Sequence, residues 1–427
     1  MARNLTLPAL LAGLAAAQKP VGTETHPKLT TYRCTVAGGC TEATNYIVLD
    51  SSSHWVHQAD GSGCGDWGSG PNATACPTVE ACAEACVMEG VSDYSTVGVA
   101  TAADALTLTL LVDGQAKSPR VYLLDETEQA YEMTKFAGGE YAFDVDVSKL
   151  PCGMNGALYL SEMEAAGGKS DLNPGGAYWG TGYCDAQCYV TPFQNGIVRQ
   201  RRGQGRLLQR DGHLGGQLAR HADRAAHVQP DGPVPVRGGR VPGRGVCDKN
   251  GCGWNNYRLD QPAYYGRGGD FTVDTTRPFT VVTQFPAGAD GQLLEIERLY
   301  VQDGVVIKSE TVAKAGTPAV DSITDEFCAA TGAARFADLG ALRGMGDAMA
   351  RGMVLAMSIW WDAEGAMVWL DGSQDGAGPC SRDEDKPDAI LAAEPDPTVV
   401  FSKMKWGEIG STFTGTAPAR RHRALRN

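Results

Sequence analysis

The chain has 427 residues, among them 54 glycines and 13 cysteines, and a formal net charge of −13. This length can bury the core of one large β domain or of two ordinary domains. The acidic balance argues against a nucleic-acid partner, because phosphates require a basic protein face. A polyanionic substrate is disfavoured for the same reason, whereas a neutral polymer is compatible with the charge.

Residues 1–17 have the pattern of a secretory signal. Arg3 precedes an apolar stretch at 5–14, and three alanines follow as a cleavage site. The stretch is too short to span a bilayer, and no other segment is apolar for 18 residues. We therefore expect an exported protein that begins at Gln18 and has no membrane attachment.

Thirteen cysteines in an exported chain predict disulfides, although the odd number leaves at least one without an internal partner. Zinc binding is the less favoured alternative, for which Cys184 with Cys188 and Cys247 with Cys252 have loosely suitable spacings. The Asn-Ala-Thr sequon that begins at Asn72 is a candidate glycosylation site in a Gly/Pro-rich loop.

Short apolar runs that alternate with polar residues predict half-buried β-strands through most of the chain. These runs cover residues 46–49, 106–110, 120–124, 141–145, 279–285, 296–301 and 305–307. Asp303 and Gly304 predict a hairpin turn between the last two. The run Met353–Trp361 is too apolar to face water on either side, and helix is predicted only at 76–88 and 325–342. The chain is therefore expected to be mainly β, as one large antiparallel β-sandwich with few short helices.

The segment 199–245 differs from both of its neighbours. It contains ten arginines but no lysine, glutamate, cysteine or aromatic residue. Such a composition usually indicates a disordered basic loop. An arginine-rich RNA-binding insertion is a further alternative, but the missing lysines and aromatics argue against it.

Five blocks of sequence together resemble the glycoside hydrolase family 7 cellulases, from about Gln18 to Thr412. The blocks are His26–Thr30, Asn155–Ser161, Tyr183–Cys188, Gly245–Arg258 and Met353–Trp361. The variants at 184–188 and 247–258, and the short link from Leu370 to Cys380, resemble the endoglucanase branch. The resemblance implies a concanavalin-like jelly roll at 18–413 with a long concave cleft, followed by a basic tail at 414–427. It also implies a secreted monomer that binds cellulose or another β-1,4-glucan and needs no metal or cofactor.

Members of this family carry a Glu-x-Asp-x-x-Glu strand, in which one glutamate is the nucleophile and the other the acid/base of a retaining reaction. Retention requires two carboxyl groups about 5–5.5 Å apart. In this chain the three acidic positions fall at Arg210, Gly212 and Gly215. None of these residues can act as nucleophile or proton donor, so we expect the chain as it stands to be inactive. A run of arginines in a central strand would also bury unpaired charge, which predicts poor folding.

A shifted reading frame explains the missing acids. One permitted choice of codons for Arg210–Gln217 is CGA GAT GGA CAT CTG GGA GGC CAA. Read one base later they become GAG ATG GAC ATC TGG GAG GCC AAy, which encodes Glu-Met-Asp-Ile-Trp-Glu-Ala-Asn. The same phase turns Leu207 and Leu208 into cysteines and adds three more at 228–244, so the total becomes even. We interpret 198–245 as out of frame through a sequence or gene-model error; a genuine inactive allele is the alternative.

The resemblance also assigns residues outside this segment. Trp360 and Trp369 match platform tryptophans that stack on sugar rings, with core packing as the alternative, and Trp55 is a weaker candidate. Six residues match positions that bind glucose hydroxyls: Asn155, Tyr159, Tyr183, Asp185, Gln187 and Arg258. The family's pairing implies the disulfides Cys34–Cys40, Cys64–Cys86, Cys76–Cys82, Cys152–Cys380 and Cys252–Cys328. Glu162 and Glu164, the nearby acids that are in frame, are interpreted as solvated. A non-catalytic glucan-binding protein is the second functional hypothesis.

Overall fold

The computed structural model describes residues 19–66, 70–183, 193–194, 197–198, 210–212, 215–216, 223–226, 248 and 250–416. The secretory-signal prediction lies outside this part, as do most of segment 199–245 and residues 417–427 of the basic tail. Strands dominate the described part and the helices are short, which confirms the predicted fold class.

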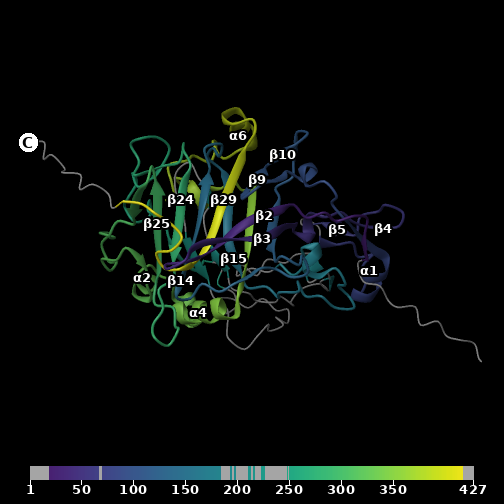
Figure 1. The fold of residues 1–427 in the computed structure, drawn as a ribbon. Helices are drawn as coiled ribbons and strands as arrows, with labels where there is room; N and C mark the ends of the chain where they lie inside the picture. The colour runs from purple at the N-terminus through teal and green to yellow at the C-terminus, as the bar shows by residue number, and fades with distance from the viewer. Residues whose placement is uncertain are drawn as a thin grey trace, which may run out of the picture.

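An outer sheet forms one layer of the molecule. Its central strands are β24 (Phe279–Gln284), β14 (Gly139–Asp146), β29 (Thr398–Glu408) and β9 (Ala105–Thr109), each antiparallel to the next. These strands run side by side through the centre of Figure 1. Beyond them lie β8 (Val99–Ala102) at one edge and β25 (Ile296–Gln302), β26 (Val305–Lys308) and β27 (Ser322–Ile323) at the other. Asp303 and Gly304 both have left-handed backbone between β25 and β26, so the predicted hairpin turn is confirmed.

An inner sheet forms the second layer and carries the candidate site. Its strands follow the order β12 (Arg120–Leu124), β28 (Met353–Trp361) and β15 (Met154–Ser161), all antiparallel, with β13 (Met133–Thr134) also against β28. Beyond β15 come β18 (Arg210–Gly212), β19 (Gly215–Gly216), β20 (Asp223–Ala226) and β21 (Cys252–Trp254).

A long hairpin joins the two sheets. Its strands are β2 (Lys28–Thr35) and β3 (Gly39–Leu49). The end of β2 pairs in parallel with β29 of the outer sheet, whereas the end of β3 pairs with β12 of the inner sheet. The two sheets are thus one continuous hydrogen-bonded sheet that folds back on itself. Among its long described strands, only β2 and β29 pair in parallel, at this junction.

The main core lies between the sheets. Phe143 of β14 and Phe401 of β29 pack there with Met357 of β28 and Leu158 of β15, and all four are at most 1% exposed. Each fully buried side chain of this size contributes about 1.5–3 kcal/mol. Residues 353–359 of β28 are buried on both faces, as predicted, and only its last two residues, both tryptophans, are half-buried.

In the C-terminal half of the chain, the helices differ from the prediction in number and in length. Residues 325–342 were expected as one helix, but the chain forms α2 (Asp325–Ala330), α3 (Ala334–Asp338) and α4 (Ala341–Arg351). Gly332 and Gly340 have φ of +85° and +106°, and this left-handed backbone interrupts the helix twice. Two further helices, α5 (Val368–Asp371) and α6 (Pro387–Ala393), were not predicted from the sequence. None of the described helices combines the length and the apolar character that a membrane crossing requires.

A small cysteine-rich lobe lies beside the sandwich, at the right of Figure 1. It contains α1 (Val79–Ala85), within the predicted range 76–88, and the strands β1 (Lys19–Val21), β4 (Val56–Gln58) and β7 (Cys86–Glu89). Cys64–Cys86 and Cys76–Cys82 close this lobe, and Cys34–Cys40, Cys152–Cys380 and Cys252–Cys328 close other parts of the chain. These are the five pairs that the family resemblance implies.

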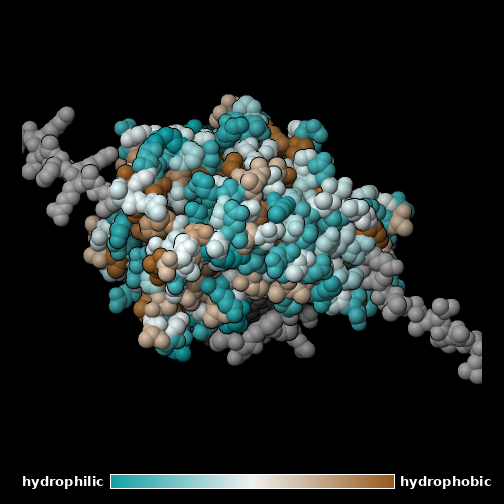
Figure 2. Space-filling model, viewed as in Figure 1, coloured by the Kyte–Doolittle hydropathy of each residue, from teal (hydrophilic) through white to brown (hydrophobic). Residues whose placement is uncertain are grey.

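Other short elements complete the described chain. They are η1 (Ser51–Ser53), η2 (Tyr94–Val97), η3 (Gly176–Trp179), β5 (Gly65–Asp66), β6 (Gly70–Pro71), β10 (Leu111–Val112), β11 (Gln115–Ala116), β16 (Phe193–Gln194), β17 (Ile197–Val198), β22 (Tyr265–Gly266) and β23 (Val273–Asp274). The surface in Figure 2 is mainly hydrophilic or neutral, with hydrophobic residues in small patches.

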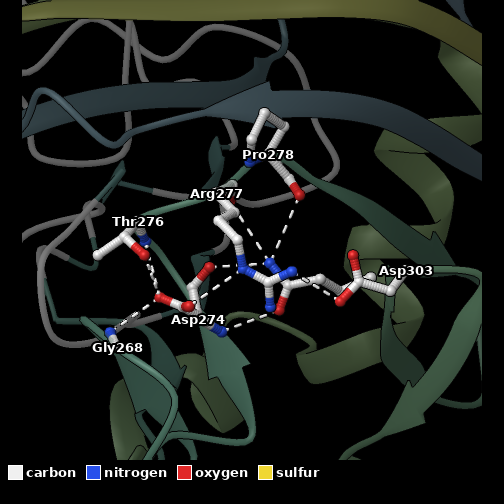
Figure 3. Close-up of polar contacts among 7 residues, drawn as sticks. Gly268, Asp274, Thr276, Arg277, Pro278 and Asp303 are labelled. Atoms are coloured by element: carbon white, nitrogen blue, oxygen red, sulfur yellow. Dashed lines mark hydrogen bonds and ion pairs between the residues drawn. The ribbon is translucent and has the colours of Figure 1, made fainter.

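Asp274, at the end of β23, anchors the loop that precedes the outer sheet (Figure 3). Its carboxylate accepts hydrogen bonds from the Gly268 N–H at 2.8 Å, the Thr276 N–H at 3.0 Å and the Thr276 hydroxyl at 2.7 Å. Arg277 donates to its second oxygen at 3.2 Å and also reaches Asp303 at 2.7 Å. Burial alone would raise the pKa of Asp274, but these donors hold it well below its ordinary value.

Candidate active site

The site-bearing face of the inner sheet is defined by strand alternation. On β15, Asn155 and Tyr159 point to the side opposite the main core, because Leu158 and Leu160 belong to that core. Asn155 lies directly opposite Trp360 of β28. Residues opposite each other in an antiparallel pair share a face, so Trp360 lies on this face as well. We call it the inner face.

Two tryptophans form an aromatic platform at one end of the inner face. The ring centroids of Trp360 and Trp369 are 6.2 Å apart with an interplanar angle of 30°, and both side chains are half-buried. Trp369 lies on the short helix α5. Half-exposed indoles leave ring surface accessible, which suits stacking on a ligand better than core packing does.

Arg258 holds the platform helix α5 in place. Its guanidinium donates to the Trp369 carbonyl at 3.3 Å and forms an ion pair with Asp375 at 2.7 Å. Asn155, beside Trp360, is 5% exposed, and its side-chain oxygen accepts no hydrogen bond within the described protein. A buried carbonyl oxygen of this kind is costly unless a ligand hydroxyl or water satisfies it. The structure thus brings together four of the predicted residues at this end, namely Trp360, Trp369, Arg258 and Asn155.

A cluster of tyrosines occupies the inner face further along. The hydroxyls of Tyr159 and Tyr183 lie 3.0 Å apart. The guanidinium carbon of Arg120 lies 3.5 Å from the Tyr183 ring centroid, a cation–π contact. The two predicted tyrosines therefore meet, although 24 residues separate them in the sequence.

Arg120, Asp50 and Tyr122 were not singled out from the sequence. Arg120 forms an ion pair with Asp50 at 2.8 Å, and both Arg120 and the Tyr122 hydroxyl donate to the same Asp50 oxygen. Burial by itself would lower the pKa of Arg120, but the charge of Asp50 and the neighbouring tyrosines, Tyr122 foremost, together outweigh burial and keep that pKa above its ordinary value. The only sequence signal for this cluster was the position of Arg120 at the start of β12, which is otherwise free of charged residues.

The positions expected for the catalytic acids lie beside β15. Arg210 of β18 pairs with Ser161, and Gly215 of β19 pairs with Ala157. Ser161 and Ala157 alternate with the core residues of β15, so positions 210 and 215 fall on the inner face. The pairing register shifts by one residue between β18 and β19. Positions 210 and 215 thus share the inner face with Asn155 and Tyr159.

Several other predicted residues lie away from this group or outside the described part. Asp185, Gln187 and the cysteines at 184, 188 and 247 are not among the described residues. Trp55 is 56% exposed, and its ring stacks on His57 with centroids 3.8 Å apart. The interpretation of Glu162 as solvated is wrong: its side chain is 18% exposed and pairs with Arg351 at 2.6 Å. Glu164 is exposed.

Two groups of described residues have metal-ligand spacing, but their cysteines are in disulfides. They are Cys64 with Cys76 and Cys86, and Cys152 with Asp371 and Cys380. A disulfide sulfur is not the thiolate that zinc binds, so neither group is a zinc site.

A β-sandwich with a tryptophan platform and adjacent polar groups on one sheet face has the features of a carbohydrate-binding protein. Comparison with known families narrows this class to one family. The chain belongs to glycosyl hydrolase family 7, whose model matches residues 19–207 and 237–413. The match is interrupted at 208–236, inside the arginine-rich segment and across positions 210, 212 and 215.

Individual relatives are similar over nearly the whole chain. Endoglucanase 1 of Pyricularia oryzae is 58% identical over 416 residues, which cover 95% of this chain and 97% of that protein. The native structure of the Humicola insolens endocellulase EGI matches with a TM-score of 0.89 and 53% identity, over 92% of this chain and 100% of that one. A Melanocarpus albomyces cellobiohydrolase complexed with cellotetraose matches at 33% identity and a TM-score of 0.81, over 92% and 99% of the two chains. The chain is therefore more similar to these endoglucanases than to that cellobiohydrolase.

Proposed function

We propose that the gene for this chain specifies a secreted endo-β-1,4-glucanase that cleaves internal bonds of cellulose or mixed-link β-glucan with retention. The observation that carries the proposal is the shared face of the Trp360 platform and positions 210 and 215. This arrangement sets a sugar-stacking surface beside the strand that holds the acids in a retaining hydrolase of this family. The relatives named endoglucanases, at 54–58% identity, support the endo-acting mode.

The proposed chemistry needs a nucleophile at position 210, a helper aspartate at 212 and an acid/base at 215. The nucleophile would form a glycosyl-enzyme, and the acid/base would protonate the leaving oxygen and then activate water. Arg210, Gly212 and Gly215 supply none of these groups. The gap in the family match covers the same three positions, which supports a local loss of reading frame.

The remaining residues of the site are proposed to bind the glucan. Trp360 and Trp369 would stack on pyranose faces, which are flat and uncharged and so suit an aromatic surface. Asn155, with its unpartnered oxygen, would accept a hydrogen bond from a sugar hydroxyl. Tyr159, Tyr183, Asp185, Gln187 and Arg258 are proposed as further hydroxyl-binding residues, and Arg258 also positions Trp369.

Sequencing the transcript across 198–246 tests the frame directly. The proposal expects bases that encode Glu-Met-Asp-Ile-Trp-Glu in one continuous frame. A confirmed arginine run, with no phase that spells these acids, would contradict it.

The matching activity test compares the chain as it stands with a frame-restored chain on soluble carboxymethyl-cellulose. The restored chain should hydrolyse it, and changing its restored acid/base glutamate to glutamine should lower kcat by about 10²–10⁴-fold. The unrestored chain should show no hydrolysis. Activity of the unrestored chain would show that the acids have been assigned to the wrong positions.

A non-catalytic glucan-binding protein is the second candidate, favoured by the platform and polar groups that persist outside the segment. Calorimetry with cellohexaose separates the two candidates once the transcript is known. Binding without hydrolysis by a chain whose arginine run is genuine would establish the second candidate. Secretion and a monomeric state are proposed with either candidate and are checked by culture-medium fractionation and light scattering.

A further inference from the structure

Two aspartates are buried together beneath the platform helix α5. Asp371, at the end of α5, is 0% exposed, and Asp385, between Cys380 and α6, is 1% exposed. Both lie against Gly153 at the start of β15. The Gly153 N–H donates to Asp371 at 3.0 Å, and a Cβ at Gly153 would lie 2.6 Å from the Asp385 Cα. The Asp371 carboxylate is also within 4.8 Å of the Cys152–Cys380 disulfide sulfurs.

The described residues give this pair very little to stabilise negative charge. Neither oxygen of Asp385 accepts a hydrogen bond, and one oxygen of Asp371 also accepts none. No lysine or arginine of the described chain forms an ion pair with either carboxylate. Two buried carboxylates without a cation or sufficient donors are strongly unfavourable when both are ionised, so such groups retain a proton.

Burial and the neighbouring acids favour the protonated form of both carboxyls. Burial raises the pKa of Asp371 to about 7, aided by Asp385 and Glu384, while the Gly153 N–H opposes the shift. Burial likewise raises the pKa of Asp385 to about 6, aided by Glu384. Arg382 opposes that shift, as does the Met367 N–H, which faces Asp385 without reaching hydrogen-bond geometry.

The sign of the pH effect follows from these directions. A carboxyl whose folded pKa is raised binds more protons in the folded than in the unfolded state, between its ordinary value of 3.8 and its raised value. Stability from this source is therefore fully present below about pH 4 and is lost as the pH rises towards 7.

We propose that Asp371 and Asp385 form a proton-dependent clamp, which fixes α5 and Trp369 against the start of β15 in acid and releases them near neutral pH. The clamp joins the platform helix to the strand that carries Asn155, and the Cys152–Cys380 disulfide keeps the two segments close after release. It concerns the stability and geometry of the platform and does not depend on catalysis by the chain.

Thermal unfolding of the full chain between pH 4 and pH 8 tests the clamp. Tm of the wild type should fall as the pH rises from 5 to 8. In D385N, which keeps the size of the side chain but cannot ionise, this fall should be smaller by at least about 3 °C. D371N is the second variant and should flatten the profile in the same way. D388N, an exposed aspartate on α6, is the matched control and should follow the wild type. Equal profiles for the wild type, D385N and D371N would overturn the proposal.

Tryptophan fluorescence reports on the platform separately from global stability. At 25 °C the wild type should show a transition between pH 6 and 7 that is absent in D385N and in W369F. A transition that persists in D385N would overturn the clamp. Addition of calcium at pH 8 tests whether the two carboxylates hold a cation instead of protons. A rise in Tm for the wild type but not for D385N would show a cation site and would overturn the proposal.

Discussion

Replacing Asp274 with asparagine tests whether the buried carboxylate in Figure 3 holds the loop before the outer sheet. Asparagine can keep the three hydrogen bonds to one oxygen, from Gly268 and Thr276, as weaker neutral bonds. Its amide would face the Arg277 guanidinium, so the fourth bond is lost and two donors oppose each other. From these losses we expect D274N to lower the free energy of unfolding by about 2–4 kcal/mol at pH 6.

The effect should shrink in acid. Because the folded pKa of Asp274 is depressed, its contribution is fully present above the ordinary value of 3.8 and is lost as the pH falls below it. At pH 3 the difference between wild type and D274N should therefore be smaller by about 1 kcal/mol.

Urea unfolding at pH 6 and pH 3, followed by circular dichroism, measures both quantities. D303N is the control, since Asp303 pairs with the same arginine but is 67% exposed, and its loss should cost less than about 1 kcal/mol. Equal destabilisation by D274N and D303N, or a D274N effect that is constant with pH, would refute the reasoning.

Three further predictions concern the site and the surface. W360A should weaken cellohexaose binding at least about tenfold, by loss of stacking worth about 1.5 kcal/mol, and W55A should have a smaller effect; equal effects in calorimetry would contradict the platform assignment. N72Q should remove a glycan-dependent mobility shift in the secreted protein, since Asn72 is exposed, and unchanged mobility after endoglycosidase treatment would count against occupancy. EDTA should leave Tm and glucan binding unchanged, and a loss of either would reveal a required metal.

The sequence was sufficient for features that depend on local pattern. An alternating apolar run located β12 and a continuous apolar run located β28, both at the observed boundaries, because the burial of a strand on one or both faces is visible in the order of its residues. The helix at 325–342 was wrong because the two glycines that interrupt it adopt left-handed backbone, which residue composition does not reveal. The same pattern reasoning identified segment 199–245 as foreign, and the gap in the family match falls within it.

The tertiary structure alone decided which distant residues meet. The pairing of Arg120 with Asp50, the burial of Asp371 beside Asp385 and the half-exposure of Trp360 depend on contacts between segments far apart in the chain. Burial, hydrogen-bond satisfaction and pKa are properties of the folded surroundings, so the order of residues cannot supply them. The sequence thus determined the kinds of element and the residue types at 210, 212 and 215, whereas folding decided which side chains share the inner face and which charges are left without partners.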